Sequence, residues 1–362
     1  MTVFPLPPGS TIGILGGGQL GRMLAMAAAR LGFDTAILTP EADSPAARVA
    51  ARVIVADYAD PAALRTLAGI SQVITFEFEN VPAAAAAELQ RLGAEVAPAT
   101  RALAVSQDRL EEKSFLNAAG IGTVGFAAVD SEADLLAAFQ RLGPSLLLKT
   151  RRGGYDGKGQ SWVRRSDDPA AALASLGNLP CIAEAPADFR REMAVIAARG
   201  RDGEIALYPL TESHHENGIL RRTSAPAKGS PRLFAEAEKI ATTLLIALEY
   251  VGVLGVELFE DDDGRLLVNE FAPRVHNTGH WTLDGCEVDQ FEQHIRAVSG
   301  WPLGPTAAIH HVEMTNLLGE EAGAWEKLAR EPETRVWLYG KRQALAGRKM
   351  GHVNRLSRLD GA

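Results

Sequence analysis

Between residue 11 and about residue 105, short apolar runs alternate with helical patterns, and this alternation limits the chain to a small set of folds. The runs TIGIL (11–15), DTAILT (34–39) and QVITFEFE (72–79) are separated by stretches such as LGRMLAMAAARLGF (20–33). Alternating strands and helices are typical of a parallel sheet, because each helix returns the chain to begin the next strand in the same direction. A chain of 362 residues also exceeds one usual core, so we expect two or three domains.

A glycine turn joins the first apolar run to its helix. Gly16, Gly18 and Gly21 have the spacing G-x-G-x-x-G, which in dinucleotide-binding proteins lets the backbone approach a pyrophosphate. That fingerprint also requires an acidic residue at the end of the second strand, whereas this strand ends in Thr39 and Pro40. Two interpretations stay open: a nicotinamide dinucleotide site, or a tight strand-to-helix connection that needs glycines.

The charge balance argues against some classes of partner. The chain has 37 basic and 45 acidic residues, giving a net charge of −8, and 46% of its residues are hydrophobic. This composition argues against nucleic acid or an anionic membrane as the main partner. The segment MTVFPLPPGS lacks the basic region of a secretory signal, no apolar run is long enough to span a bilayer, and Cys181 and Cys286 lack metal-ligand spacing. We therefore expect a cytoplasmic protein.

Two further regions follow the parallel sheet. The segment DRLEEKSFLNAA begins with Asp108 and places Glu111 three residues later, a capping signature that predicts the start of a helix and of a new unit. Short strands and a helix up to about residue 183 predict a small lid. Alternating segments such as REMAVIAAR then predict a larger antiparallel sheet with one main helix. The expected domains are 1–107, 108–183 and 184–362.

The segment KTRRGGYDGKGQ (149–160) carries the densest chemical signal. It places four glycines and four cations between two expected strands, so its backbone can approach a negatively charged ligand. Polyphosphate fits this composition, because backbone N–H groups and ammonium groups both donate to phosphate oxygens. The segment is not a Walker A loop, since Gly159 follows Lys158 where that motif needs Ser or Thr. The alternative is a mobile basic hairpin tip.

Two acidic residues face each other in the predicted hairpin GVELFEDDDGRLLVNEF. If its Asp-Gly pair forms a two-residue turn, Glu257 lies opposite Glu270. The same register places Phe259 opposite Val268. Opposed carboxylates repel each other unless a cation offsets the repulsion, and magnesium binds one or two carboxylates together with phosphate oxygens and water. The pair therefore predicts a magnesium site, and the alternative is two solvated glutamates on an exposed sheet.

Polar residues continue around and after this pair. Asn269 adjoins Glu270 and offers an amide to the metal or to a phosphate. Arg274, His276 and Asn277 follow within four residues, and donors of this kind can hold a small anion such as bicarbonate or a carboxylate.

A basic cluster lies near the carboxyl terminus, in WLYGKRQALAGRKMGHV (337–353). It contains Lys341, Arg348 and Lys349 on what we expect to be two short strands. A solvated basic face and an anion site both remain open for it.

Together these segments resemble the ATP-grasp superfamily, and within it the 5-(carboxyamino)imidazole ribonucleotide synthetases. The resemblance extends over nearly the whole chain, through GGGQLGRM, TFEFENVP, QDRLEEK, GGYDGKGQ, GVELF, NEFAPRVHNTGHWT, YGK and GRKMGH. It implies an α/β fold of the ATP-grasp type, with a Rossmann-like pre-ATP-grasp domain, a small lid domain and a larger antiparallel carboxyl-terminal domain. The first glycine turn would then line a ribonucleotide site and bind no dinucleotide.

The resemblance also implies where ATP binds. Its adenine would lie beside the segment EAPA, where Pro186 has no N–H and Ala187 becomes the expected donor. Val275 stands where family members often carry proline. The residues implied for ATP are Arg109, Lys149, Gly154, Tyr155, Asp156, Gly157, Lys158, Gly159, Gln160, Glu184, Ala185, Pro186, Ala187, Glu192, His215, Asn269 and Glu270.

The implied reaction begins with attack of bicarbonate on the γ-phosphorus of ATP. Carboxyphosphate forms, and the carbon dioxide that it releases adds to the exocyclic amine of aminoimidazole ribonucleotide. The implied catalytic residues are Arg274, His276 and Asn277 on bicarbonate, and Tyr155, Asp156 and Lys158 on the amine. The ribonucleotide would contact Gln19, Leu20, Glu77, Lys341 and Arg348, and magnesium would bind Glu257 and Glu270.

Two rival functions would use the same nucleotide residues. A ligase that joins a carboxylate to an amine would release phosphate without bicarbonate, and a nucleotide sensor would bind ATP without turnover. The family resemblance also implies a homodimer, small-molecule substrates, no biotin, and no nucleic-acid or membrane partner.

Overall fold

The amino-terminal region is built on a parallel sheet, as the alternating runs predict. In the computed structural model, which describes residues 2–154 and 157–359, its elements are β1 (Thr11–Leu15), α1 (Gln19–Arg30), β2 (Asp34–Thr39), β3 (Arg52–Val55), α2 (Pro61–Ile70), β4 (Val73–Phe76), α3 (Ala83–Arg91) and α4 (Thr100–Ser106). The strands pair in parallel in the order β3-β2-β1-β4. The glycine turn therefore lies at the carboxyl edge of this sheet, where ligands of open α/β sheets usually bind.

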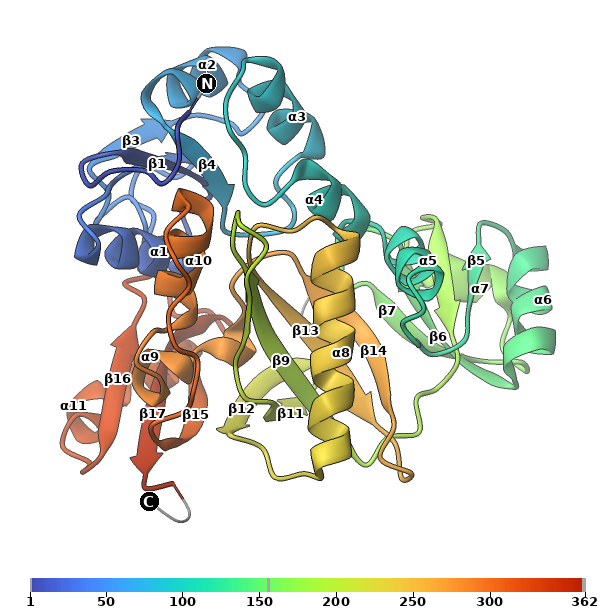
Figure 1. Ribbon diagram of the computed structural model, residues 1–362. Coiled ribbons are helices and arrows are strands. Elements are labelled where there is room, and N and C mark those ends of the chain that lie inside the picture. The colour runs from blue at the N-terminus through green and yellow to red at the C-terminus, as the bar shows by residue number, and fades with distance from the viewer. Residues whose placement is uncertain (1, 155–156, 360–362) are drawn as a thin grey trace.

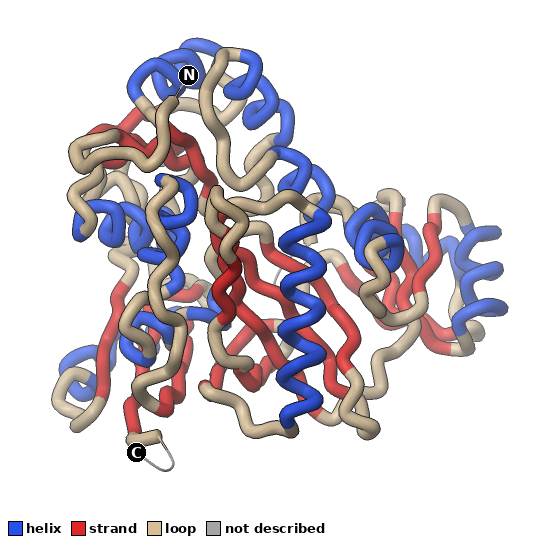
Figure 2. Tube along the Cα trace, viewed as in Figure 1, coloured by secondary structure: helices blue, strands red, loops and turns tan. Residues whose placement is uncertain are grey.

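A small antiparallel unit follows and stands beside the rest of the molecule (Figure 1; Figure 2). Its elements are β5 (Phe126–Val129), α6 (Glu132–Leu142), β6 (Ser145–Thr150), β7 (Gln160–Arg164), α7 (Pro169–Ser175) and β8 (Cys181–Glu184), with strand order β5-β8-β6-β7. The helix before it, α5 (Arg109–Ala118), is capped by Asp108, which accepts the N–H groups of Leu110 and Glu111 at 3.0 and 3.4 Å. Leu116 of α5 packs into the core of the next region.

The largest region is an antiparallel sheet. Its strands are β9 (Arg191–Arg199), β10 (Ile205–Leu207), β11 (Thr211–Glu216), β12 (Ile219–Ala225), β13 (Gly252–Glu260), β14 (Leu266–Ala272), β15 (His311–Leu318), β16 (Thr334–Leu338) and β17 (Lys349–Ser357). They run in the order β14-β13-β9-β11-β12-β15-β17-β16, with β10 beside β9. The helices are α8 (Pro231–Ala247), α9 (Thr282–Gly285), α10 (Gln290–Ser299) and α11 (Trp325–Leu328), with 3-10 turns η1 (Asn277–Gly279) and η2 (Gly319–Ala324). The predicted fold class, including this larger sheet, is confirmed.

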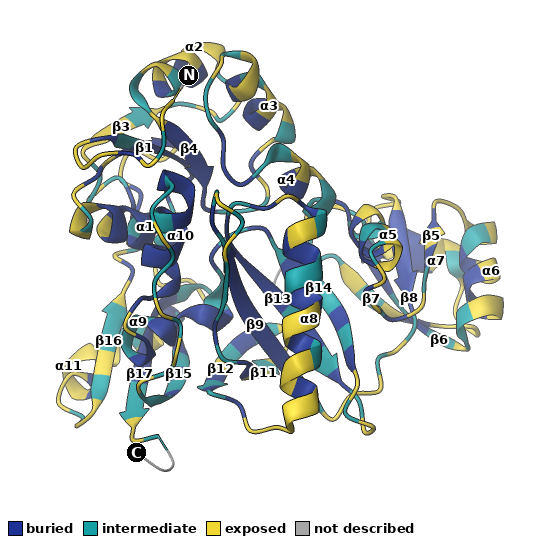
Figure 3. Ribbon diagram, viewed as in Figure 1, coloured by how far each residue is buried: buried dark blue, intermediate teal, exposed yellow. Residues whose placement is uncertain are grey.

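The two faces of the large sheet are covered differently. Alternation along β9 sends Val195 to the face under α8, where Leu244 packs, and sends Ile196 to the opposite face with Phe291 of α10. The outward side of α8 is exposed (Figure 3). Helix α10 also packs against α1, so Leu24 belongs to the same core as Phe291. No described helix, α8 included, is long and apolar enough to cross a membrane.

Candidate active site

The predicted glutamate pair lies on the hairpin of β13 and β14, at one end of the large sheet. Glu257 and Glu270 are directly opposed in the register, as predicted. Arg109 Nη1 lies 2.7 Å from Glu270 Oε2, and His276 Nε2 lies 3.6 Å from Glu257 Oε1. Arg109 belongs to the first turn of α5, so the capped helix carries this cation to the hairpin.

Nearer the tip, the predicted hairpin register is wrong. Phe259 pairs with Leu267 and not with Val268. A β-bulge makes Asn269 an extra residue on β14, and a loop over 261–265 replaces the predicted two-residue turn. Asn269 therefore adjoins the glutamate pair at an irregular point of the strand, as is common beside active sites.

The two opposed carboxylates differ in charge state. Burial favours the neutral acid, but Arg109 outweighs it at Glu270 and lowers the pKa of that carboxyl to about 2. Burial and the charge of Glu270 raise the pKa of Glu257 to about 7. The same two causes raise the pKa of Glu112, which accepts the Phe271 N–H at 2.7 Å, to about 8. Three carboxyls are thus gathered around one guanidinium, which makes the hairpin attractive to a further cation.

The hairpin fits a magnesium ion. Magnesium needs only one or two protein carboxylates, because substrate phosphates and water fill its other positions. Within residues 2–154 and 157–359, no group of three or more histidine, cysteine or acidic side chains is arranged to hold a metal. Glu257 and Glu270 therefore suit an ion that takes most of its ligands from substrate and water, and do not form a closed protein cage.

Two lysines share one buried glutamate next to the hairpin. Lys149 Nζ lies 2.7 Å from Glu184 Oε2, and Lys113 Nζ lies 3.3 Å from Glu184 Oε1. Burial would raise the pKa of Glu184, but the two lysines lower it. Lys113 also donates to Asn269 O at 3.1 Å. The sequence reasoning missed Lys113, although it follows Arg109 by four residues and so shares one face of α5 with it.

The glycine loop of the small unit reaches across to the large sheet. Arg109 Nη2 donates to Gly154 O at 3.1 Å. At Gly157, whose φ is +76°, an added Cβ would lie 3.1 Å from Asn217 O, in the turn between β11 and β12. The loop thus passes over the space beside Glu270, as a lid over phosphates must.

The base of this loop is held by Asp108. Arg151 Nη2 lies 3.0 Å and Arg152 Nε 3.3 Å from Asp108 Oδ2, and the Arg109 N–H donates to Arg151 O at 2.9 Å. Two of the four predicted loop cations therefore bind the cap of α5. Lys149 and Lys158 are left as the cations of this segment that we assign to phosphate.

The other residues predicted for ATP lie around this loop. Glu192 on β9 forms an ion pair with His215 on β11, and this partner raises the pKa of His215 even though burial acts to lower it. Strand β8 ends at Glu184 and leads into Ala185, Pro186 and Ala187, while Gly159 and Gln160 lead into β7. Tyr155 and Asp156 lie outside the described residues.

The predicted anion segment runs from the end of β14 into η1. Arg274 is paired with Glu79, whose pKa it holds below the usual range although burial acts to raise it. Burial and Arg274 lower the pKa of His276 to about 3, so its imidazole is neutral. Both polar side-chain atoms of Asn277 are buried without a hydrogen-bond partner among the described residues. An amide in this state suits a polar ligand.

A cavity of about 60 Å³ lies where these elements meet. Its lining includes Arg109, Gly154, Glu270, Arg274 and His276. The glycine loop, the glutamate hairpin and the anion segment therefore open onto one shared space.

The first glycine turn is filled by a protein carboxylate. Glu77, at the end of β4, accepts the N–H of Gly18 through Oε1 and the N–H of Gly21 through Oε2, the latter at 2.6 Å. Gly16, with φ of +120°, leaves room for this side chain, since an added Cβ would lie 2.1 Å from Glu77 Cγ. The carboxylate occupies the anion position at the start of α1, which a dinucleotide pyrophosphate would need. This contact argues against the nicotinamide interpretation and leaves Gln19 and Leu20 in the first turn of α1.

The carboxyl-terminal basic cluster adjoins this turn. Lys341 and Arg348 lie in the connection between β16 and β17, so the prediction that they stand on strands is wrong. The chain must turn there, and Lys341 Nζ donates to Lys349 O at 2.7 Å across the turn. Lys341 is close enough to Glu77 for its charge to act on that carboxyl, and Arg348 donates to Gln343 O at 3.3 Å.

Lys349, the first residue of β17, is a second residue that the predicted site omits. Its charge acts on Glu257, His215 and His276, so it lies near the hairpin and the anion segment. The motif GRKMGH contains it, and its position at a strand start beside Arg348 was the available signal.

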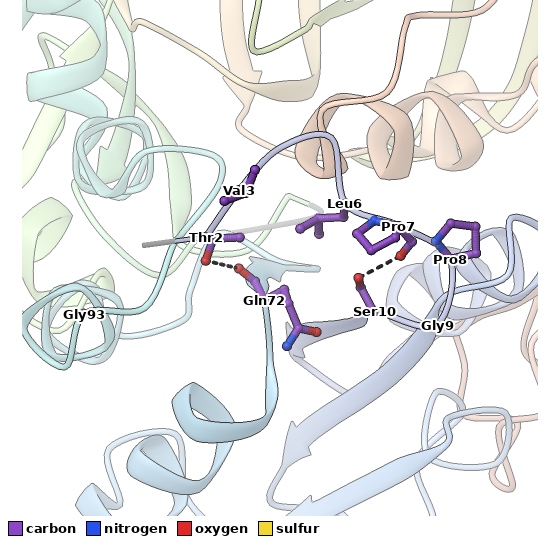
Figure 4. A pocket seen from close by; sticks show the side chains of 9 residues that line it. All are labelled: Thr2, Val3, Leu6, Pro7, Pro8, Gly9, Ser10, Gln72 and Gly93. Atoms are coloured by element: carbon purple, nitrogen blue, oxygen red, sulfur yellow. Dashed lines mark hydrogen bonds between the residues drawn. The ribbon is translucent and has the colours of Figure 1, made fainter.

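A larger surface hollow, of about 700 Å³, lies elsewhere (Figure 4). It is lined by residues such as Pro7, Pro8 and Gln72, at the amino ends of β1 and β4. Because these strands are parallel, the glycine turn and Glu77 lie at their opposite ends. No charged residue is among those that line the hollow, so it offers phosphate nothing and carries no part of this site.

The fold and the site together define an ATP-grasp protein, in which a small sheet and a large sheet enclose the nucleotide phosphates. Residues 10–107 match the ribonucleotide synthetase preATP-grasp domain, residues 114–291 the ATP-grasp domain, and residues 313–360 the phosphoribosylaminoimidazole carboxylase C-terminal domain. The chain belongs to the N5-carboxyaminoimidazole ribonucleotide synthase family. It is 52% identical to that synthase from Brucella melitensis, with 97% of each chain covered, and 42% identical to the one from Bacillus subtilis, with 96% and 91% covered.

Solved structures of the family superpose closely on this chain. A synthetase bound to ADP gives a TM-score of 0.93 at 42% identity, covering 97% of this chain and 93% of the other. The Aspergillus clavatus synthase in complex with ADP and 5-aminoimidazole ribonucleotide gives 0.91 at 31% identity, with 97% and 94% covered.

Proposed function

We propose that this chain carboxylates the exocyclic amine of 5-aminoimidazole ribonucleotide in purine biosynthesis, using ATP and bicarbonate. The observation that carries the proposal is the shared cavity on which the glycine loop, Glu270, Arg274 and His276 meet. Transfer of a phosphoryl group from ATP to bicarbonate requires phosphate, metal and anion positions next to one another. Family membership supports the same activity.

The first step transfers the γ-phosphoryl group. A bicarbonate oxygen attacks the γ-phosphorus, the bond to the bridging oxygen of ADP breaks, and carboxyphosphate forms. Bicarbonate is held by the Arg274 guanidinium, the neutral His276 imidazole and the buried Asn277 amide, whose two polar atoms need a partner. Lys149 and Arg109 offset the charge that builds up on the phosphoryl oxygens.

The second step makes the carbamate. Carboxyphosphate breaks into carbon dioxide and phosphate, the amine nitrogen bonds to the carbon of carbon dioxide, and the amine loses one proton. Tyr155, Asp156 and Lys158 orient the amine and close the site, and Asp156 accepts the proton. The ribonucleotide lies beside Gln19, Leu20 and Glu77, with Lys341 and Arg348 on its 5′-phosphate.

Magnesium is bound by Glu257 and Glu270, with Asn269 adjoining. When bound, it neutralises charge on the ATP phosphates and aligns them. The adenine lies beside residues 184–187, where the Ala187 N–H is the hinge donor, and Glu192 and His215 contact the ribose side of the nucleotide. No biotin takes part. We also propose a cytoplasmic homodimer, because the substrates are charged intracellular metabolites; light scattering should give twice the mass of one chain.

The test is ADP production with and without each substrate. We expect ADP to form fastest when bicarbonate and aminoimidazole ribonucleotide are both present. Phosphate release that ignores bicarbonate would favour a carboxylate–amine ligase. ATP binding without turnover under every substrate combination would favour a nucleotide sensor.

A further inference from the structure

The geometry points to Gln290 as the residue that positions His276 for bicarbonate, an inference that rests on the function proposed above. Gln290 Oε1 accepts the His276 N–H at 2.8 Å, and Gln290 Nε2 donates to His276 O at 2.7 Å. One side-chain amide thus satisfies both backbone groups of a single residue. Gln290 is fully buried, so neither bond competes with bulk solvent.

The Gln290 amide is itself fixed in place. Gln290 is the first residue of α10, and its backbone N–H donates to Thr282 Oγ1 at 3.0 Å. Gly279 lies so close that an added Cβ would be 2.5 Å from Gln290 Oε1. His280 Nδ1 lies 3.1 Å from Gln290 Nε2. The amide therefore has contacts on several sides and little freedom to take another rotamer.

The pairing matters because the segment that carries His276 has left the sheet. Strand β14 ends at Ala272, so ladder hydrogen bonds no longer hold the chain at His276, and Gln290 supplies the two bonds in their place. On the sheet side Gly255 has no side chain, and an added Cβ there would lie 2.6 Å from His276 Cβ. The imidazole is held between Gly255 and the Gln290 amide, with Nε2 facing Glu257. A misplacement of about 1 Å in such a group costs about a hundredfold in rate.

The chain offers a matched control on the same helix. Gln293 is also fully buried in α10, and its amide makes the same two-point pairing with one residue: Oε1 accepts the Gly304 N–H and Nε2 donates to Gly304 O, both at 2.8 Å. Gly304 belongs to none of the segments that line the site. Loss of either amide therefore removes equivalent buried hydrogen bonds, and only one of the two should affect bicarbonate.

The experiment compares Gln290→Leu with Gln293→Leu in the full chain. Each variant's Tm is measured, and ADP formation is followed against bicarbonate, ATP and ribonucleotide in carbon dioxide-depleted buffer. We expect similar losses of Tm, a roughly tenfold or larger rise in the KM for bicarbonate only in Gln290→Leu, and changes below about threefold in the KM for ATP in both. Gln290→Glu keeps the acceptor for the His276 N–H and should give an intermediate KM, which also serves if the leucine variant does not fold.

His276→Ala separates failure of this inference from failure of the proposed function. If His276→Ala leaves the KM for bicarbonate unchanged, the bicarbonate assignment and the role of Gln290 both fall. If His276→Ala raises that KM while Gln290→Leu and Gln290→Glu match Gln293→Leu, only the positioning role is overturned.

Discussion

The two glycine-rich turns of this molecule differ in the charge that meets them. In the first, residues 16–21, backbone N–H groups point at the Glu77 carboxylate. In the second, residues 153–159, the loop is held by Arg109 through Gly154 O and continues from Lys149. Glycines explain how closely another group can approach, and the neighbouring charge decides which group it is. The first turn is therefore already occupied by an anion, whereas the second is built to receive one.

The largest effect should come from removing the carboxylate on the phosphate side. Glu270→Ala takes away a proposed magnesium ligand and the partner of Arg109, so we expect turnover to fall about a thousandfold or more. Glu257→Ala should act in the same direction and less severely. Metal-free Tm should also fall in Glu270→Ala, because the Arg109 guanidinium would lose its ion pair.

The exposed Asp262 at the hairpin tip supplies the control, and Asp262→Ala should retain turnover. Near wild-type magnesium-dependent ATPase activity in Glu270→Ala would show that the hairpin does not bind the metal.

The next effect tests the occupied turn. Because Glu77 fills the anion position of that turn, the ribonucleotide phosphate needs cations from elsewhere, and the adjoining carboxyl-terminal cluster is proposed to supply them. Arg348→Ala should raise the KM for aminoimidazole ribonucleotide about ten- to a hundredfold, the value of a charge-assisted hydrogen bond. The KM for ATP should change by less than about threefold.

Arg348→Lys should recover part of this loss. Arg342→Ala, in the same connection but on an exposed ion pair with Asp43, should change neither KM. A variant at Arg348 that loses ATP affinity and keeps ribonucleotide affinity would reverse the assignment of the two sides.

Sequence reasoning could predict the parts of this site that depend on local pattern. Alternating runs predicted the parallel region, and strand alternation predicted the direct opposition of Glu257 and Glu270. It missed what depends on side chains meeting across the fold. The bulge at Asn269 shifts the hairpin tip by one residue, and two-residue periodicity cannot indicate where such an insertion falls.

Charge partners from distant segments were equally hidden. Nothing in the spacing of the first glycine turn shows that Glu77, on another strand, accepts its N–H groups. The sharing of Glu184 between Lys113 and Lys149 likewise joins α5, β6 and β8, whose residues lie far apart in the sequence. The resemblance to a family supplied what the local pattern did not.

A smaller effect should follow from changing the charge in the first turn. Glu77→Gln places an amide group against a backbone N–H, so one of two buried bonds is lost and we expect a loss of about 1–3 kcal/mol in the free energy of unfolding. The KM for the ribonucleotide should rise while that for ATP stays constant. Asp60, which accepts the N–H groups of Ala62 and Ala63 at the start of α2, gives a control cap remote from the site. If Asp60→Asn changed the ribonucleotide KM as much as Glu77→Gln, the effect would be general loosening of the region.

The smallest effect concerns acid, and it separates the supports of the two sides. His294 of α10 holds the strand that carries Glu77: its Nδ1 accepts the Val253 N–H at 3.1 Å, so its Nε2–H donates to Thr75 Oγ1 at 2.8 Å. Burial lowers the pKa of His294 to about 3. A histidine with a lowered folded-state pKa contributes stability that is present above pH 6.5 and lost as the pH falls towards 3. His215, whose pKa is raised by Glu192, acts in the opposite direction and loses its contribution above pH 6.5. Unfolding measured between pH 7 and pH 4 should therefore show that His294→Gln, which cannot gain a proton, reduces the acid slope by up to about 1.4 kcal/mol per pH unit. The exposed His214 gives the matched control, since solvent reaches its imidazole in the folded chain as well. An equal acid slope in wild type and His294→Gln would mean that acid acts through other buried groups, and that the support of the first turn is no more sensitive to acid than that of the second.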